Sequence, residues 1–253
     1  MLILPVRTGM LKAGDDLAAA IVQSVALQSG DIIVVSSKVA ATVEGAAVEL
    51  AKIRVSPEAE ELYRAFGKTP QHRQFVLDET ARMNGTVIRT MNGVVLTELK
   101  PDGIAEGTLI VPNAGIDESN IERGWAVGWP RDPVESVRRL RRELMKKVDS
   151  VAIILSDSGL SPRRSGVTAF ALTVAGMDPL YDRRGKPDLY GRDMVMTVEA
   201  IADQLATAAN SVMGNADERT PAAVIRDHGL PMTEFTGWVP GIEREKDVYF
   251  GVV

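Results

Sequence analysis

Two aspartates in this 253-residue chain each follow an apolar segment with the composition of a buried strand. Asp117 comes shortly after the run 108–111, and Asp157 comes shortly after the run 151–155. Ligands of open α/β sheets bind at the carboxyl ends of strands, and carboxylate oxygens are ligands that Mg²⁺ and Mn²⁺ prefer. The pattern predicts a divalent-metal site at Asp117 and Asp157, with a hydroxyl from Ser158. An aspartate at a strand end can equally well cap a helix or fix a turn.

Arginines lie close to these aspartates in the sequence. The turn 162–166 contains Arg163 and Arg164, and the charged loop 182–192 ends in Arg192. A guanidinium group matches phosphate or carboxylate with two parallel hydrogen bonds. We therefore expect an anionic ligand near these residues, with loop 182–192 acting as a structured binding loop or lid. An exposed basic turn is the alternative for Arg163 and Arg164.

The composition excludes several kinds of chemistry. The chain has no cysteine, so disulfides, thiolate metal sites and cysteine nucleophiles are absent. Only two histidines are present, which disfavours a histidine-rich zinc site and a Ser-His-Asp triad. The net charge of −5, without long charged blocks, argues against general nucleic-acid binding. No segment has the pattern of a signal peptide or membrane span, so a cytoplasmic protein is expected.

Hydrophobic periodicity and capping residues predict the elements that position these residues. Helices are expected over 17–27, 57–66, 71–83, 132–147 and 197–213. Strands are expected over 32–36, 86–89, 94–97, 108–111, 151–155, 169–174 and 222–225. This alternation predicts a mixed α/β or α+β fold, with no prediction of strand order. Residues 36–38 form a candidate ligand loop, and the basic face of helix 132–147 is interpreted as a solvated surface.

Several motifs, taken in order, resemble one known family. They are Gly14-Asp15-Asp16-Leu17, Ser36-Ser37-Lys38-Val39, Glu44-Gly45, Phe75-Val76-Leu77-Asp78-Glu79-Thr80, Asn113-Ala114-Gly115-Ile116-Asp117 with Ser119-Asn120, Ser156-Asp157-Ser158, Asp188-Leu189-Tyr190-Gly191-Arg192, Thr197-Val198-Glu199, Ala202-Asp203 and Val212-Met213-Gly214. Together they resemble the γ-glutamyl ligases of coenzyme F420 biosynthesis along nearly the whole chain.

The resemblance implies a GTP-dependent ligase that requires Mg²⁺ or Mn²⁺. Such an enzyme joins the α-amino group of L-glutamate to a carboxylate of the deazaflavin precursor coenzyme F420-0, through an acyl phosphate. It also implies an unusual α/β fold and an intertwined homodimer. Residues 1–253 would form a single ligase-like unit; two subdomains without a clear boundary are the alternative.

The family's functional positions can be placed on this chain residue by residue. The metal positions fall on Asp117, Asp157 and Ser158. Arg164 and Arg192 are the arginines that would hold carboxylates or phosphates during catalysis. The nucleotide contacts fall on Thr8, Gly9, Met10, Leu11, Ser37, Lys38, Asn120, Met213, Gly214, Asn215, Ala216, Asp217, Glu218, Arg219 and Thr220.

Three departures from the family pattern concern the nucleotide and the acceptor. Thr42 stands where the family usually has a nucleotide-binding lysine, and Asn215 stands where some members have an acidic residue. The segment 159–161 lacks the usual Gly-Arg pair and the aromatic that normally follows is also missing. Two alternatives therefore stay open: a ligase for another amino acid or acceptor, and a paralogue that binds cofactor or nucleotide without catalysis.

Overall fold

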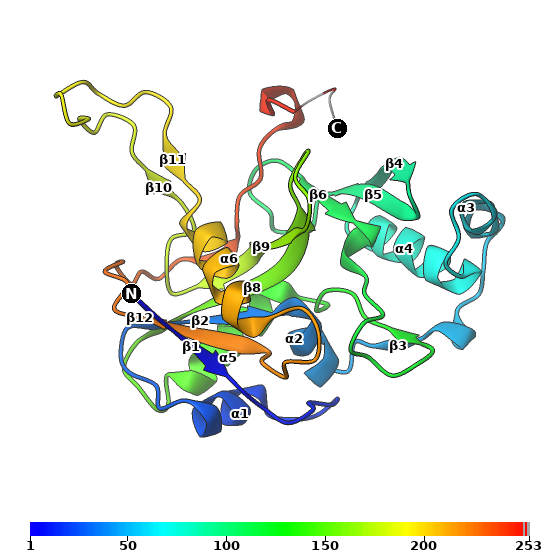
Figure 1. The fold of residues 1–253 in the computed structure, drawn as a ribbon, viewed down its shortest axis with the longest axis horizontal. Helices are drawn as coiled ribbons and strands as arrows, with labels where there is room; N and C mark the ends of the chain where they lie inside the picture. Colours follow the sequence, from blue (N-terminus) through cyan, green and yellow to red (C-terminus); the bar gives the residue numbers. More distant parts are fainter. Residues whose placement is uncertain (250, 252–253) are drawn as a thin grey trace.

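The computed structural model describes residues 1–249 and 251, and its centre is a six-stranded sheet (Figure 1). The strand order is β1-β12-β2-β8-β9-β13, with β2 and β8 parallel and the other neighbours antiparallel. The strands are β1 (Leu2–Val6), β12 (Ala222–Arg226), β2 (Asp31–Ser36), β8 (Val151–Leu160), β9 (Val167–Ala175) and β13 (Thr236–Trp238). The fold is therefore of the mixed α/β class that the sequence predicted.

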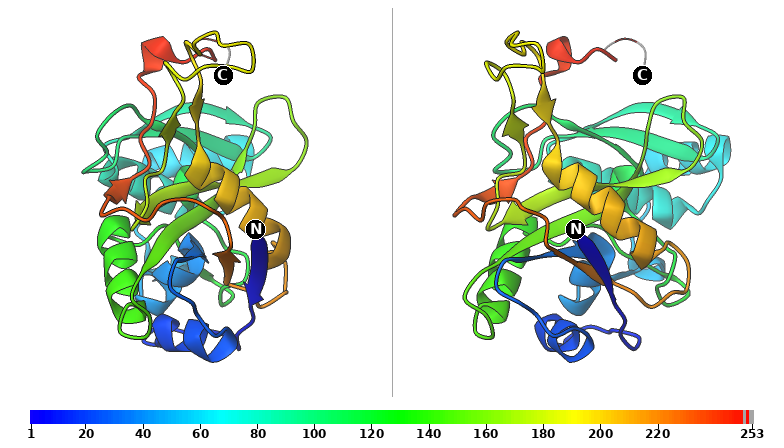
Figure 2. Two further views of the ribbon diagram at one scale, coloured as in Figure 1. Left: turned by 90° about the vertical axis from the view of Figure 1, so that its left-hand side faces the viewer. Right: turned by 60° about the vertical axis from the view of Figure 1, so that its left-hand side comes forward.

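Helices cover both faces of this sheet, because its central strands are apolar on both sides. The helix α6 (Ile201–Met213) packs on the face that carries Ile32, Val34 and Ile154. The opposite face carries Ile33, Val35 and Ile153. It is covered by α1 (Leu17–Ser24) and α5 (Pro133–Leu144). Figure 2 shows the sheet between α5 and α6.

A smaller group of elements lies beside the central sheet. It contains α3 (Pro57–Phe66), α4 (Pro70–Arg82) and the antiparallel strands β4 (Thr86–Met91), β5 (Val94–Leu99) and β6 (Leu109–Pro112). Its buried Phe75, Val95 and Val111 belong to the same hydrophobic cluster as Ile33 and Val35 of β2. One continuous core thus joins the smaller group to the central sheet.

Short elements complete the described chain. They are the helix α2 (Ser37–Val43), the paired strands β3 (Val48–Glu49) and β7 (Trp125–Ala126), the paired strands β10 (Tyr181–Asp182) and β11 (Val198–Glu199), and the 3₁₀ turns at Leu50–Lys52, Asn113–Gly115 and Arg244–Lys246. In Figure 1 the β10–β11 hairpin projects from the body of the molecule. None of the helices in the described part of the chain is long and apolar enough to cross a bilayer.

Most of the predicted elements are confirmed. Capping residues explain why the ends of several helices lie close to their predicted positions. Asp16 caps α1, Ser56 caps α3 and Asp132 caps α5, each by accepting a hydrogen bond from a backbone N–H in the first turn. Gly214 follows α6 with a positive φ of 74°, as expected of a residue that ends a helix. The Asn92-Gly93 turn between β4 and β5 is also confirmed.

Three local predictions were wrong. Residues 197–200 are not helical, because Val198 pairs with Asp182 in the β10–β11 hairpin and is 41% exposed. Ser37 and Lys38 do not form a loop, because they begin α2. The strand β8 does not end at residue 155 but continues to Leu160, paired with β9 beyond an irregularity at Ser156. Asp157 therefore lies within a strand.

Candidate functional site

Polar segments from five parts of the chain meet at one edge of the central sheet. Val6 at the end of β1 pairs with Ala222 at the start of β12, and Ala222 pairs in turn with Val35 near the end of β2. Ser36, the last residue of β2, lies opposite Ser156 of β8. Four segments are therefore neighbours: those that follow β1, β2 and residues 151–155 of β8, and the one that precedes β12. The Asp117 loop contacts two of them, as described next.

Asp117 is held in place by a tight turn and a short antiparallel pairing. Asn113, Ala114 and Gly115 all have positive φ values, of 50°, 52° and 73°. This left-handed turn is fixed by Asn113, whose Oδ1 accepts a hydrogen bond from the Val95 N–H. Asp117 and Val127 then exchange two backbone hydrogen bonds of 2.9 Å.

The Asp117 carboxylate binds a lysine and a serine. Lys38 Nζ lies 2.5 Å from Oδ2 of Asp117 and also donates to Oγ of Ser119. The backbone N–H and hydroxyl of Ser119 donate to the two carboxylate oxygens at 2.7 and 2.8 Å. Burial opposes ionisation of this carboxyl, but the hydrogen bonds from Lys38 and Ser119 outweigh it and hold the pKa of Asp117 below its usual range. Asp117 is therefore an anion at neutral pH.

Asp157 has different partners and the opposite pKa shift. The indole Nε1 of the buried Trp129 donates to Oδ2 at 2.6 Å, and the backbone N–H of Ser158 donates to Oδ1 at 2.8 Å. Burial raises the pKa of Asp157 to about 6; these two hydrogen bonds oppose the shift, and the nearby Asp117 carboxylate adds to it. The Trp129 indole also lies against Gly115, two residues before Asp117, so both predicted metal residues lie near this one side chain.

Carboxylate and hydroxyl oxygens, the ligand types that a hard divalent cation prefers, occur at this edge. The Lys38 ammonium contacts the Asp117 carboxylate and the Ser119 hydroxyl, so this side of the edge already holds one positive charge. Within residues 1–249 and 251, no group of three or more His, Asp or Glu side chains forms a cage for a metal. A bound Mg²⁺ or Mn²⁺ would complete its coordination with water or ligand oxygens, as Mg²⁺ usually does.

The segments predicted to contact the nucleotide are brought together. The Thr8 N–H donates to the Arg219 carbonyl, which joins the segment after β1 to the loop before β12. Asn120 Nδ2 donates to the Ala216 carbonyl at 2.6 Å, which joins the Asp117 loop to the same loop. The Ser36 N–H donates to the Pro221 carbonyl, which places the start of α2 beside it. These contacts link segments that are distant in the sequence.

The remaining predicted residues lie in less connected positions. Ser158 is exposed, and its backbone N–H donates to Oδ1 of Asp157. Arg164 is exposed in the β8–β9 turn, where its backbone N–H donates to the Ser161 carbonyl. Arg192 lies on the β10–β11 hairpin and contacts its neighbours Asp188 and Tyr190. The single chain does not pair either arginine with Asp117 or Asp157.

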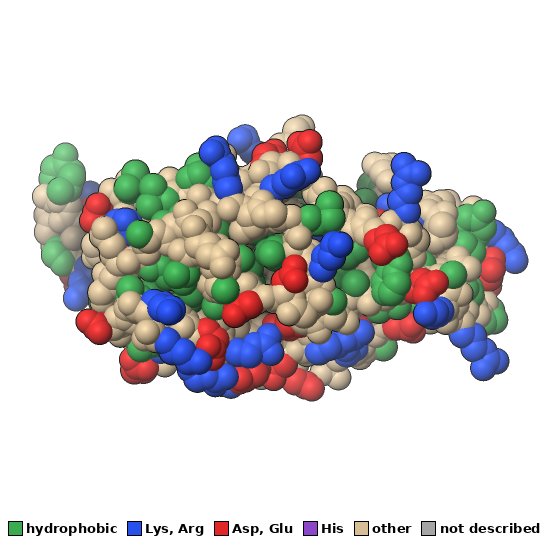
Figure 3. Space-filling view, turned by 90° about the horizontal axis from the view of Figure 1, so that it is seen from below, with side chains coloured by type: hydrophobic (Ala, Val, Ile, Leu, Met, Phe, Trp, Pro, Cys, Tyr) green, Lys and Arg blue, Asp and Glu red, His purple; other side chains and the backbone are tan. Residues whose placement is uncertain are grey.

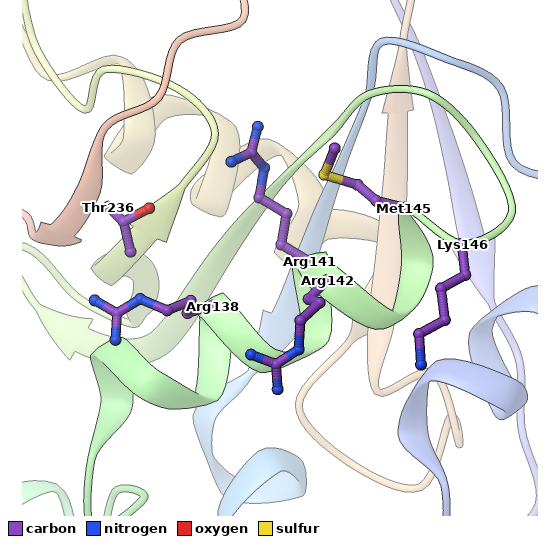
Figure 4. A pocket seen from close by; sticks show the side chains of 6 residues that line it. All are labelled: Arg138, Arg141, Arg142, Met145, Lys146 and Thr236. Atoms are coloured by element: carbon purple, nitrogen blue, oxygen red, sulfur yellow. The ribbon is translucent and has the colours of Figure 1, made fainter.

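Hollows elsewhere on the surface of the described residues include two beside α5. One, on the outer side of α5, is lined by Arg138, Arg141, Arg142, Met145, Lys146 and Thr236. Their charged ends diverge rather than converge (Figure 4). Arg138 and Lys146 form ion pairs with acidic residues of the same helix region, in agreement with a solvated basic face. Seen from below, the molecule carries interleaved acidic and basic side chains (Figure 3).

The second hollow is a cleft of about 770 Å³ between α1, α2 and α5. Its floor includes Val35, Ile153 and Leu155, and its lining does not include Asp117 or Asp157. Ala40 and Val43 of α2 line the cleft, whereas Lys38 of the same helix contacts Asp117. The two carboxylates therefore lie outside this cleft.

Sequence reasoning missed two residues that organise this edge. Ser119 lies two residues after Asp117, and that short spacing is typical of a turn in which an aspartate accepts a backbone hydrogen bond. Trp129 had no such signal, because nothing in the local sequence connects it with Asp157. Its role follows from the pairing of Asp117 with Val127, which brings the following residues to the site.

The fold and this edge define a mixed α/β protein with a two-carboxylate site beside its central sheet. A family model described as F420-0:Gamma-glutamyl ligase matches residues 5–227. A coenzyme F420:L-glutamate ligase of Methanopyrus kandleri is 37% identical over 228 residues, which cover 90% of this chain and 86% of that protein. One of Methanothermobacter thermautotrophicus is 36% identical over 250 residues, 96% and 95% of the two chains. This chain belongs to the F420-0:γ-glutamyl ligase family.

Proposed function

We propose that this protein is a GTP-dependent ligase that adds L-glutamate to coenzyme F420-0. Its family membership over residues 5–227 supports the ligase class and the two substrates. The observation that supports the proposal is that Trp129, which donates to Asp157, lies against the Asp117 segment at Gly115, at the edge where the predicted nucleotide segments also meet. That arrangement provides the acidic and polar groups that a metal-bound triphosphate requires.

The reaction is an amide-bond formation in two steps. A carboxylate is a poor electrophile, so the F420-0 carboxylate oxygen first attacks the γ-phosphorus of GTP, forming an acyl phosphate and releasing GDP. The amine of L-glutamate then attacks the acyl carbon, phosphate leaves, and the nitrogen loses a proton. Phosphoryl transfer of this kind depends on positioning and charge stabilisation more than on a protein nucleophile. A chain without cysteine is suited to such chemistry.

Each part of the edge has a task in this proposal. Asp117 and Asp157, with Ser158, would hold Mg²⁺ or Mn²⁺, which neutralises charge on the transferring phosphoryl group. Lys38 lies close enough to Asp117 to contact a phosphate bound beside that carboxylate. Asn120 and the loop of residues 213–220, already joined by a hydrogen bond, would contact the nucleotide. Arg164 and Arg192 would bind substrate carboxylates or phosphates.

A homodimer is part of the proposal. The β10–β11 hairpin carries exposed apolar side chains at Leu189, Tyr190, Val195 and Met196, each more than 80% exposed. Such a projecting apolar segment is typical of a surface that packs against another chain. In an intertwined dimer, the hairpin of one subunit would bring Arg192 toward the site of the other. We expect the predicted catalytic role of Arg192 to depend on that contact.

A cofactor-binding protein without ligase activity is the second candidate, and Thr42 favours it. Its hydroxyl donates to the Lys38 carbonyl at 2.7 Å, within the same helix, and supplies no cation to a triphosphate. A protein of this kind would bind the deazaflavin without metal-dependent affinity for a guanine nucleotide.

Incubation with GTP, Mn²⁺, L-glutamate and F420-0, followed by mass spectrometry, tests the proposal. A ligase adds the mass of one or more glutamyl units and releases GDP and phosphate. The same mixture with ATP in place of GTP tests nucleotide preference, and a mixture with EDTA tests metal dependence. Unchanged F420-0 together with tight deazaflavin binding would select the second candidate.

A further inference from the structure

Trp129 contacts both segments of the proposed metal site, because it donates to Asp157 and lies against Gly115, two residues before Asp117. It is one of the largest fully buried side chains of the described protein, at 1% exposure. Its indole is packed against Trp238, with ring centroids 6.0 Å apart. The Trp238 Nε1 in turn donates to the carbonyl of Asp102 at 3.1 Å. The indole of Trp129 therefore has a fixed orientation before any ligand binds.

The backbone pairing that places Asp117 also places Trp129. Because Asp117 pairs with Val127 in an antiparallel bridge, Gly115 on one segment lies across from Trp129 on the other. A Cβ atom at Gly115 would lie 2.4 Å from the indole Nε1, which is closer than real contacts allow. The absence of a side chain at Gly115 thus lets the indole pass over this segment and reach Asp157.

The hydrogen bond from the indole N–H holds the Asp157 carboxylate in one orientation. Trp129 Nε1 donates to Oδ2 and the Ser158 N–H donates to Oδ1, so each oxygen has one fixed donor. An ionised carboxylate oxygen accepts about two hydrogen bonds, so each oxygen retains one further acceptor position. Groups that orient a metal ligand in this way typically change metal affinity or activity by about 10- to 100-fold when they are removed.

We infer that Trp129 is a positioning residue for the divalent cation: a single side chain fixes the carboxylate of Asp157 relative to that of Asp117 through its indole N–H and its contact with Gly115. The inference rests on the proposed metal site and goes beyond it, because it assigns a task to a residue to which the proposed function gives none. Its ligand is a hard divalent cation, Mg²⁺ or Mn²⁺.

The substitution W129F tests this task, because it removes the N–H and keeps an aromatic ring. Mn²⁺ binding is measured on the full chain by electron paramagnetic resonance of the free ion. We expect W129F to bind Mn²⁺ about tenfold more weakly than the unmodified protein. The matched control is W125F: Trp125 lies in β7, paired with β3, and should leave the affinity unchanged.

A second measurement on the unmodified protein covers the case in which W129F does not fold. In the ¹⁵N spectrum of the indole groups, addition of Mg²⁺ should shift the Trp129 Nε1 resonance and leave that of Trp125 in place. A tryptophan whose N–H does not bond to a metal-binding carboxylate would show no such shift.

The outcomes separate the inference from the proposed function. Two results would overturn the positioning role and leave the metal site intact. One is normal Mn²⁺ affinity in folded W129F; the other is an unshifted Trp129 resonance under conditions in which Mg²⁺ binds. Failure of the unmodified protein to bind either ion overturns the metal site and the inference together. Weaker Mn²⁺ binding in W129F but not in W125F supports the inference.

Discussion

Asp117 and Asp157 are the same residue type at the same edge of one sheet, yet their surroundings differ. Asp117 lies in a loop and pairs with the Lys38 ammonium, which favours its charged form. Asp157 lies within a strand and accepts from a neutral indole, and burial favours its protonated form. The comparison teaches that one carboxylate is charged in advance, whereas ionisation of the other would gain most from the proposed cation.

Substitution of either aspartate should have the largest effect. D117N and D157N each remove one negative charge from the proposed metal site. We expect each to lower the ligation rate by at least about 100-fold, since a metal supplies several kcal/mol of charge stabilisation. The rate is measured by mass spectrometry of the glutamylated product, with circular dichroism to confirm folding.

The control for this pair is D149N, an exposed aspartate in the turn before β8. It should retain the full rate. Full activity in D157N would refute its assignment as a metal ligand, and a difference between D117N and D157N in their remaining Mn²⁺ affinity would show which carboxylate binds the ion more strongly.

The second effect concerns stability without metal. The pKa of Asp157 is raised to about 6 from its usual 3.8, so its stabilising contribution is complete below pH 3.8 and is lost as the pH rises through about 6. The shift corresponds to at most about 3 kcal/mol. The D157N protein, which carries no charge there, should therefore be more stable than the unmodified protein at pH 7.5 in EDTA, and equally stable at pH 4.

Urea unfolding at the two pH values measures this difference. An equal free energy of unfolding for both proteins at pH 7.5 would show that burial of the ionised Asp157 carboxylate does not destabilise the fold. D117N should behave in the opposite sense, because the ionised Asp117 is stabilised by Lys38 and Ser119.

The third and smallest effect concerns the cationic side of the site. Thr42 lies one helical turn after Lys38 and bonds to its carbonyl. In T42K, a second ammonium would lie near the bound triphosphate and form a charge-assisted hydrogen bond worth about 1.5–3 kcal/mol. We expect GTP to bind about tenfold more tightly or better by calorimetry. T42S is the control, and unchanged affinity in T42K would indicate that the nucleotide binds away from α2.

Local signals in the sequence predicted most elements, because helix ends and turns depend on neighbouring residues. Asp16, Ser56 and Asp132 cap the helices where their types indicated, and Asn92-Gly93 forms its turn. Residues 197–200 were assigned to a helix because their pattern continues that of α6. The pairing of Val198 with Asp182 overrides this pattern, and the residues around either position do not predict that pairing.

The sequence by itself determined which elements and reactive residues this protein has: apolar strands, capped helices, two aspartates and no cysteine nucleophile. Only the tertiary structure decided the hydrogen-bond partners and the pKa shift of each aspartate. Lys38 reaches Asp117 and Trp129 reaches Asp157 across long stretches of chain. The pKa of a carboxyl depends on burial and on the donors and charges within a few ångströms, and these come from segments that only the fold brings together.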